Sequence, residues 1–315
     1  MLLRKFFLAS LIFSLFFLFA CSKDDDNGGA AKGNLKLEIT DAPADDAEIE
    51  AVFVTVAEIE IDGEEVEGFN KTTIDLMLYQ EGLTYLLADI ALDARQYNRV
   101  SLVLDNESDA AGNSPGSYVL TTDGLKHALA TSSQKIHLDH NFGIVQHAET
   151  HLVIDFDLRK TIKRSETGES KYAFVSSAQM NNSIRVVNAS NAGTIVGNCN
   201  DMITDSDLII VYAYHKGSFN KNVETQASSE TNLLFSNAVN SATVDANGNY
   251  QLHFLEEGEY QLHFASYKRD DQTGRLELNG SLELDLLTSG NLKAVQVDAN
   301  ANTTVNVLVT GLLPL

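Results

Sequence analysis

Two aspartates, Asp155 and Asp157, lie two residues apart at the end of a run that alternates like a strand. On a strand, this spacing places both carboxylates on the same face. Such a pair could serve as acid and base in glycoside hydrolysis, or could bind Ca²⁺, which takes about six to eight oxygen ligands. Asp41, Asp45 and Asp46 could add oxygens if the fold brings their turn near. We expect an exposed charged strand face. Calcium is preferred to hydrolysis as the alternative because the chain is so acidic.

Histidines are the second group that could do chemistry, because four of the eight lie close together in the chain: His137, His140, His147 and His151. A zinc site needs three or four ligands that converge at about 2 Å. The segment from Ala148 onward alternates like a strand, which weakens a shared helical face for the last two histidines. We expect exposed strand-face histidines and no metal.

Other catalytic signatures are missing from the sequence. It contains no nucleophile elbow, phosphate loop or dinucleotide fingerprint. We therefore predict no catalytic residues, no cofactor and no enzymatic activity. The formal net charge is −22, and removal of residues 1–20, which hold Arg4 and Lys5 and no acid, makes the chain two charges more negative. This charge argues against nucleic acid as a partner, because phosphates demand a basic face.

The N-terminus carries the most specific signal in the chain. Arg4 and Lys5 precede a nearly unbroken apolar run that ends at Ala20, so residues 1–20 read as a signal peptide. The run is too short for a comfortable transmembrane helix, which needs roughly 20 apolar residues. Leu18-Phe19-Ala20-Cys21 resembles the lipobox of bacterial lipoproteins. That resemblance implies cleavage before Cys21 and lipidation of its thiol and amine, with palmitate among the acyl chains, and several chains anchor a protein stably.

Residues 21–33 read as the lipidated cysteine and a flexible acidic and glycine-rich linker. Ser22 to Asp26 is similar to the short lysine-plus-acid export tag of surface lipoproteins in the Bacteroidota. This similarity implies display on the outer face of the outer membrane. We predict a bacterial outer-membrane protein that is held by its N-terminal lipid and faces the exterior. Cys199 then has no intramolecular partner, and we expect it to be buried.

Strand patterns begin at Asn34. Leu35, Leu37 and Ile39 alternate with polar residues, as in a half-buried strand. The next apolar series changes phase between Val56 and Ile59, which predicts a bulge. Asp62-Gly63 is a hairpin turn signal. The leucine-rich and alanine-rich segment 83–92 is instead predicted to form a short helix.

Several segments of this half resemble domain-of-unknown-function family 4382. They are Gly33–Pro43, Ile49–Ile61, Asp75–Met77, Gly82–Leu87, Tyr97–Leu102 and Asp155–Thr161. The resemblance covers about Gly33 to Val187, and the chain departs from the family pattern at Arg95 and Ser101. It implies a β-rich domain on lipid-anchored envelope proteins, with no established activity.

The composition changes at residues 188–197, which are rich in Asn, Ala, Ser and Gly and mark a domain boundary. Beyond it, the pentapeptide Tyr-Gln-Leu-His-Phe occurs at 250–254 and again at 260–264, which predicts two antiparallel strands of one hairpin. His253 and His263 are expected to form a solvated pair on its polar face. Residues 245–260 resemble the repeat of prealbumin-like sandwiches, as in carboxypeptidase regulatory-like and collagen-adhesin B-type domains.

The sequence thus predicts an all-β protein with two tandem β-sandwich domains behind a lipidated flexible tether. Their predicted limits are 34–187 and 192–315. The predicted function is a non-enzymatic surface lipoprotein that acts as a binding, adhesive or spacer module with a protein or glycan ligand. The first alternative is glycan capture in a nutrient-uptake assembly, with an aromatic platform drawn from Tyr79, Tyr85, Tyr97, Tyr118 and Tyr172. The weaker alternative is a carboxylate-dependent hydrolase using Asp155 and Asp157.

Overall fold

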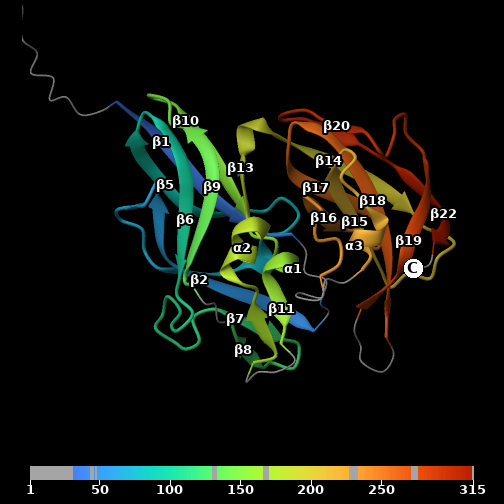
Figure 1. Cartoon of the computed structure of the whole chain (residues 1–315), viewed down its shortest axis with the longest axis horizontal. Coiled ribbons are helices and arrows are strands. Elements are labelled where there is room, and N and C mark those ends of the chain that lie inside the picture. Colours follow the sequence, from blue (N-terminus) through green and yellow to red (C-terminus); the bar gives the residue numbers. More distant parts are fainter. Residues whose placement is uncertain are drawn as a thin grey trace, which may run out of the picture.

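The computed structural model describes residues 31–42, 46, 48–129, 133–165, 170–226, 233–270 and 276–313. Strands make up 55% of the structure and helices 8%, which confirms the predicted all-β sandwich fold. Figure 1 shows two groups of sheets side by side, with the short helices α1 and α2 between them. The predicted signal peptide, Cys21 and most of the linker lie outside the described residues.

The N-terminal domain contains two main sheets and three short helices. Its elements are β1 (Lys32–Thr40), β2 (Ile49–Ile61), β3 (Glu64–Glu65), β4 (Thr72–Asp75), η1 (Leu76–Leu78), β5 (Tyr85–Asp93), β6 (Gln96–Leu104), β7 (Tyr118–Thr121), β8 (Lys126–Ala128), β9 (Lys135–Gly143), β10 (Glu149–Asp155), α1 (Leu158–Thr161), β11 (Ile162–Arg164), β12 (Tyr172–Phe174), α2 (Ser177–Ser183) and β13 (Arg185–Asn188). One sheet has the order β13-β10-β1-β5, and the other has the order β8-β7-β2-β6-β9 with β3 and β4 also on β2.

The first strand of the described chain occupies the interior of its sheet. β1 pairs in parallel with β10, so that Leu37 lies opposite Leu152 and Ile39 opposite Ile154, and it pairs antiparallel with β5 on its other side. The alternating apolar residues of β1 are fully buried in a core that extends from Leu35 to Val186. Burial of such side chains contributes about 1.5–3 kcal/mol each.

The bulge predicted in β2 and the hairpin turn predicted after it are both present in the structure. One predicted helix is not. The register of β2 against β6 shifts between Val56 and Glu58, at the predicted bulge. Asp62 and Gly63 both have positive φ, as a type I′ hairpin turn requires. The helix predicted over residues 83–92 is wrong, because Tyr85–Asp93 is the strand β5. Pairing with β1 along most of that strand outweighs the local helix propensity of leucine and alanine.

The C-terminal domain is a second sandwich. Its elements are β14 (Ala192–Asn200), β15 (Leu208–His215), α3 (Lys221–Glu224), β16 (Asn240–Thr243), β17 (Asn249–Glu256), β18 (Gly258–Arg269), β19 (Leu276–Leu286), β20 (Val295–Val297), β21 (Asn302–Thr304) and β22 (Val307–Leu313), and η2 (Ala189–Asn191) leads into it. The strand order is β16-β15-β18-β19-β22-β14-β17, with β20 on β18 and β21 on β14. The apolar run predicted as a central strand is β15, which lies between β16 and β18.

The predicted hairpin of the two identical pentapeptides is wrong. β17 pairs with β14, whereas β18 pairs with β15, β19 and β20. Only Glu257 separates β17 from β18, whereas a tight hairpin loop commonly has two residues. Because the two strands pair with different neighbours, the chain passes at Glu257 from one side of the sandwich to the other. Tyr250 and Phe264 nevertheless meet in the core, with ring centroids 5.3 Å apart.

A candidate binding pocket between the domains

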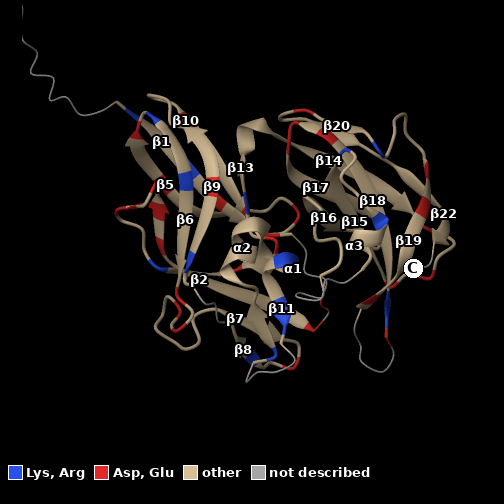
Figure 2. Cartoon of the chain, in the orientation of Figure 1, with Lys and Arg blue, Asp and Glu red and all other residues tan. Residues whose placement is uncertain are grey.

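Helix α1 joins the two domains through buried cations. Arg159, which is 5% exposed, donates from Nη1 to the carbonyl oxygens of Leu234 and Phe235 at 2.9 and 3.2 Å. Its guanidinium carbon lies 5.3 Å from the ring centroid of Tyr212 in β15. Lys160 Nζ donates to the carbonyl oxygen of Ala238 at 2.5 Å. Figure 2 shows basic residues on α1, between the two groups of sheets.

Asp157 supplies the negative charge that these cations need. It has φ of 37°, in the left-handed region, just before α1. Its Oδ2 lies 3.5 Å from Arg159 Nη2 and 3.3 Å from Lys160 Nζ. Burial lowers the pKa of Lys160, and the charge of Asp157 opposes this. Asp157 therefore has a structural role in the junction.

Asp155 is held by a third cation that contacts both domains. Arg185 in β13 donates to Asp155 Oδ2 from Nε at 3.1 Å and from Nη2 at 2.5 Å, and from Nη1 to the carbonyl oxygen of Phe254 at 3.3 Å. Asp155 and Asp157 are 2% and 3% exposed. The expectation of an exposed charged strand face is therefore wrong, because the C-terminal domain and these cations cover the polar side of the strand end.

Asp41 lies in the same electrostatic environment. Its Oδ1 accepts from the backbone N–H of Leu158 at 2.9 Å, and its Oδ2 accepts from Gln80 Nε2 at 3.0 Å. Burial raises the pKa of Asp41 well above its usual value, and the nearby charges of Asp157 and Asp155 add to the increase. Of the three aspartates in the Asp41–Asp46 segment that could add oxygens, Asp41 lies near Asp155 and Asp157.

The described contacts do not support the alternative of a calcium site at these aspartates. Within the described residues, no group of three or more His, Cys, Asp or Glu side chains is arranged to hold a metal ion. Asp46 is engaged elsewhere, since it accepts from Arg164 Nε at 2.7 Å and Nη2 at 2.6 Å. Asp45 lies outside the described residues. Arg185, Arg159 and Lys160 balance the charges of Asp155 and Asp157 without a bound cation.

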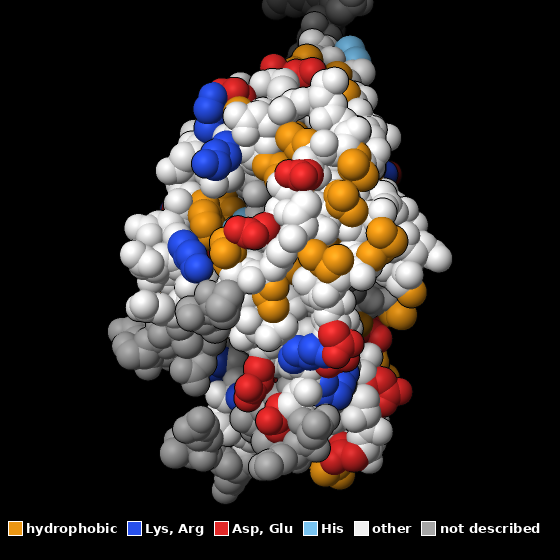
Figure 3. Space-filling model, turned by 90° about the vertical axis from the view of Figure 1, so that its right-hand side faces the viewer, with side chains coloured by type: hydrophobic (Ala, Val, Ile, Leu, Met, Phe, Trp, Pro, Cys, Tyr) orange, Lys and Arg blue, Asp and Glu red, His pale blue; other side chains and the backbone are white. Residues whose placement is uncertain are grey.

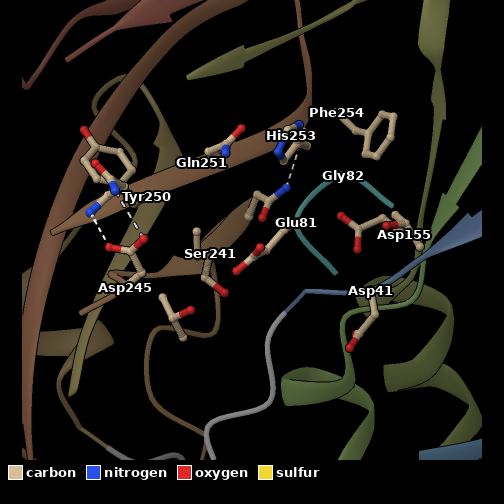
Figure 4. Close-up of a pocket in the computed structure, with 15 residues that line it drawn as sticks. Asp41, Glu81, Gly82, Asp155, Ser241, Asp245, Tyr250, Gln251, His253 and Phe254 are labelled. Carbon is tan, nitrogen blue, oxygen red and sulfur yellow. Dashed lines mark hydrogen bonds between the residues drawn. The ribbon is translucent and has the colours of Figure 1, made fainter. Parts of the chain in front are cut away.

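A hollow of about 70 Å³ opens between the domains beside this junction. Figure 4 shows Glu81 and Ser241 at its centre, Asp41 and Asp155 at one end, Asp245 at the other, and His253 above. The remaining lining residues are Thr40, Gly82, Asn240, Ala242, Thr243, Asn249, Tyr250, Gln251 and Phe254. The lining residues include the four acidic residues Asp41, Glu81, Asp155 and Asp245 and no lysine or arginine.

Three polar atoms in this lining are buried and have no hydrogen-bond partner among the described residues: Asp155 Oδ1, Ser241 Oγ and His253 Nε2. Buried polar atoms are nearly always hydrogen-bonded, and each exception costs about 1–3 kcal/mol. All three atoms are closed off from solvent, so they are buried in the packing around the hollow and are not offered to its open space. Sequence reasoning missed Ser241 and Glu81, which have no distinguishing pattern around them.

Local backbone geometry shapes two walls of the pocket. Glu81 and Gly82 both have positive φ in a turn closed by the Leu83 N–H to Gln80 carbonyl hydrogen bond. A Cβ on Gly82 would lie 2.7 Å from Nδ1 of His253, so glycine allows the domains to approach here. Phe254 has φ of 53° and lies at a register shift in the β14–β17 pair, which turns its ring from the core toward the pocket.

The histidines do not come together as a site. Within the cluster 137–151, His137 Nδ1 lies 3.1 Å from Ser101 Oγ and His151 Nε2 lies 2.6 Å from Glu38 Oε2. His140 and His151 are half-buried, and the other two are exposed. The expected solvated pair of His253 and His263 is wrong, because the two strands lie on different sides of the sandwich. His263 instead stacks on Phe219 with ring centroids 4.2 Å apart.

The aromatic platform suggested for glycan binding is not formed by the five tyrosines. Tyr97, Tyr118 and Tyr172 are 4%, 7% and 1% exposed. Tyr79 and Tyr85 are half-buried and pack on the core, with ring centroids 5.4 Å apart. Cys199 is buried as expected, and burial raises the pKa of its thiol to about 12.

The outer end of the C-terminal domain carries dispersed apolar residues. Figure 3 shows hydrophobic side chains in several small groups among polar ones on this face. Met202, Ile203 and Leu287 are the most exposed large apolar residues of the domain. Scattered apolar residues are ordinary on protein surfaces and do not define a docking site.

Within the described part of the chain, no helix is long and apolar enough to cross a membrane.

Residues 32–176 match the model of a family described as a domain of unknown function, DUF4382, which confirms the resemblance seen in the sequence. No curated protein sequence matches the chain significantly. The C-terminal resemblance to prealbumin-like domains and the lipoprotein assignment stay predictions.

Three solved structures that resemble the chain have low sequence identity and low TM-scores. A candidate carbohydrate-binding protein from Pseudomonas aeruginosa has 14% identity and a TM-score of 0.24, over 39% of this chain and 91% of that one. A minor pilin from Streptococcus agalactiae has 12% identity and a TM-score of 0.20, over 89% and 98%. A candidate cell-adhesion protein from Bacteroides fragilis has 7% identity and a TM-score of 0.18, over 87% and 92%.

Proposed function

We propose that the protein is a non-enzymatic binding and adhesive module that a lipid on Cys21 holds on the outer face of a bacterial outer membrane. The observation that carries this proposal is the junction at α1. Arg159 and Lys160 bind backbone carbonyls of the C-terminal domain and hold the two sandwiches together. A tethered pair of docked domains suits a protein whose task is to present a surface at a fixed distance from its anchor.

The placement of the chain ends supports this role. β1 begins on the side of the N-terminal domain that faces away from the C-terminal domain (Figure 1). A tether attached there leaves the interdomain pocket and the whole second sandwich farther from the membrane. The acidic lining of the pocket and the net charge of −22 favour uncharged or cationic ligands over anionic ones.

One observation favours a hydrolase as a second candidate. Asp41, whose pKa burial raises, and Asp155, which forms an ion pair with Arg185, line the same pocket. Two carboxyl groups at one site can act as acid and base in glycoside hydrolysis. However, both oxygens of Asp41 already accept hydrogen bonds from Leu158 and Gln80. This leaves the carboxyl poorly placed to protonate a leaving group, and we prefer binding.

Cell fractionation and surface proteolysis test the proposal. The wild-type chain is expected to sediment with outer membranes and to be cut by protease added to intact cells. Cys21→Ala should be released into the soluble fraction, whereas Cys199→Ala, which changes a buried thiol, should stay with the membrane. Membrane retention of Cys21→Ala would overturn the lipid anchor, and protection of the wild type from protease would overturn outward display.

A further inference from the structure

The contact between the two domains includes a histidine that touches both of them. His253 lies on β17 of the C-terminal domain, and its Nδ1 is 3.4 Å from Oγ1 of Thr194 on the neighbouring strand β14. The turn at Gly82 of the N-terminal domain lies against the same ring (Figure 4), and a Cβ at this position would lie 2.7 Å from Nδ1 and 2.8 Å from Cε1. Only a residue without a Cβ leaves room for the imidazole. The ring is therefore part of the surface on which the domains meet.

The other ring nitrogen of His253 is enclosed by the packing. Nε2 is buried, and it has no hydrogen-bond partner among the described residues. A neutral ring carries one N–H, whereas the imidazolium carries an N–H on both nitrogens. A charged ring with a buried N–H that lacks an acceptor is costly. The docked arrangement therefore accommodates the neutral ring better than the charged one, and burial lowers the pKa of His253.

The charged groups around His253 do not remove this penalty. Glu81, in the turn that faces the ring, opposes the effect of burial on the pKa of His253 but does not cancel it. β14 and β16, which pack against β17, contain no charged residue. The other charged residues of the pocket lining, of β17 and of the adjacent strand β13 are Asp41, Asp155, Arg185, Asp245 and Glu256. Burial is thus the dominant influence on this ring.

Two further groups near the domain boundary have shifted pKa values, and they act in opposite directions. Burial lowers the pKa of His140 on β9, and the charge of Glu256 in the C-terminal domain opposes this. Burial raises the pKa of Asp41 well above its usual value. A group whose pKa is raised in the docked form holds its proton more tightly there. Acid would therefore strengthen the domain contact through Asp41 and weaken it through either histidine.

We propose that His253 is a pH switch for the contact between the two domains, and that its protonation separates β17 from the Gly82 turn and opens the interdomain pocket. This inference goes beyond the proposed function, since it concerns when the facing surfaces of the two sandwiches are exposed. Withdrawal of the turn brings water to the ring, which stabilises the imidazolium. The separated form then gains population below about pH 6.5, the ordinary pKa of histidine, by up to about tenfold for each pH unit.

The repeated pentapeptide supplies a matched control. His263 occupies the same position as His253 in the second copy, and its Nε2 is also buried without a hydrogen-bond partner among the described residues. Its ring contacts Phe219 and Phe235, which both belong to the C-terminal domain. Protonation of His263 is therefore expected to act on the stability of that domain and not on its contact with the Gly82 turn.

Hydrogen exchange of the detergent-solubilised full chain, read by mass spectrometry, tests the switch. Samples should be compared from about pH 7.5 to about pH 5, with exposure times scaled for the pH dependence of the chemical exchange rate. In the wild type and in His263→Phe, protection of residues 80–84 and 251–255 is expected to fall by up to about tenfold per pH unit below about pH 6.5. His253→Phe keeps a ring that does not titrate, and His253→Gln keeps a neutral polar group, so both should hold this protection constant.

Constant protection in the wild type, or a loss in both His253 variants equal to that of the wild type, would overturn the switch. A loss that extends over β18, β19 and β22 would show unfolding of the C-terminal domain in place of separation, and would also overturn it. If neither variant folds, NMR of the His253 ring in the wild type decides, because a titration midpoint that differs from the midpoint of lost protection contradicts the proposal. These results do not depend on the lipid anchor or on a ligand, so the proposed function is tested separately.

Discussion

Replacement of Arg159 by methionine should weaken the contact between the two domains. Methionine keeps much of the side-chain volume but removes the charge and all donors. The Leu234 and Phe235 carbonyl oxygens lose the Nη1 donor, and Asp157 loses one of its two cations. Lys160 remains 3.3 Å from Asp157 and prevents complete loss of charge balance.

The size of the effect follows from the burial of these groups. Removal of one partner from a buried ion pair costs about 3–5 kcal/mol. Carbonyls that lose a charged donor cost about 1–3 kcal/mol each, but the two costs overlap because one side chain supplies both interactions. We therefore expect a total of about 3–5 kcal/mol, which raises the population of the separated form by roughly 10²–10⁴.

Two measurements together report this change. The chain has no tryptophan, so urea unfolding should be followed by far-UV circular dichroism. Hydrogen exchange read by mass spectrometry then shows where protection is lost. Arg159→Met should separate the unfolding of the two sandwiches into two transitions and should speed exchange in residues 233–239, which receive the arginine.

A surface ion pair provides the control. Lys216 and Glu259 lie in the C-terminal domain with side chains 49% and 47% exposed, and such pairs contribute about 0–1 kcal/mol. Lys216→Met should leave the unfolding curve and the exchange pattern close to wild type. If Arg159→Met behaves like Lys216→Met in both measurements, the junction is not held by Arg159 and the reasoning is refuted.

The remaining predictions concern pH and close packing. Burial lowers the pKa of His263 to about 4. As the pH falls, the unfolded chain therefore protonates this histidine near pH 6.5, whereas the folded chain does so only near pH 4. Up to about 3 kcal/mol of folding stability is lost as the pH falls from about 6.5 to about 4. His263→Phe, which retains the ring contact with Phe219, should flatten the melting temperature over this range, and an unchanged slope would assign the pH dependence to other groups. Gly82→Ala should destabilise the domain contact more than Gly63→Ala, because both glycines have positive φ but only at Gly82 would the new Cβ meet His253. Equal melting temperatures for these two variants would show that the close approach carries no energy.

Strand identity could be predicted well from the sequence because side-chain alternation is a local property. The apolar residues of β1 and the phase change in β2 both report which face of the strand is buried. The helix predicted over residues 83–92 failed because β5 is an edge strand, and only its pairing with β1 decides its conformation. The hairpin predicted from the two identical pentapeptides is wrong for a topological reason, since β17 pairs with β14 and β18 pairs with β15, β19 and β20.

The site was only partly accessible from the sequence. Asp41, Asp155 and Asp157 could be picked out as a group from the sequence. Their burial could not, because the alternation of apolar and polar residues placed Asp155 and Asp157 on the solvent side of the strand. The neighbouring Arg159 and Lys160 were the available signal, since buried carboxylates need cations. Ser241 and Glu81 reach the pocket only through the docking of two separate sandwiches, and no pattern within either segment indicates that.

The position of β1 has a mechanical consequence for the proposed N-terminal tether. β1 lies between β10 and β5, and its partner β10 runs in the same direction. The outer domain follows β13, which runs antiparallel to β10 with Asn188 opposite Leu152, and Leu152 lies opposite Leu37 of β1. The tether and the outer domain would therefore pull at the same end of this sheet, and its rungs would open one after another, as when a hairpin is unzipped. The contacts of Arg159 and Lys160 with the outer domain offer the load a path that bypasses β13.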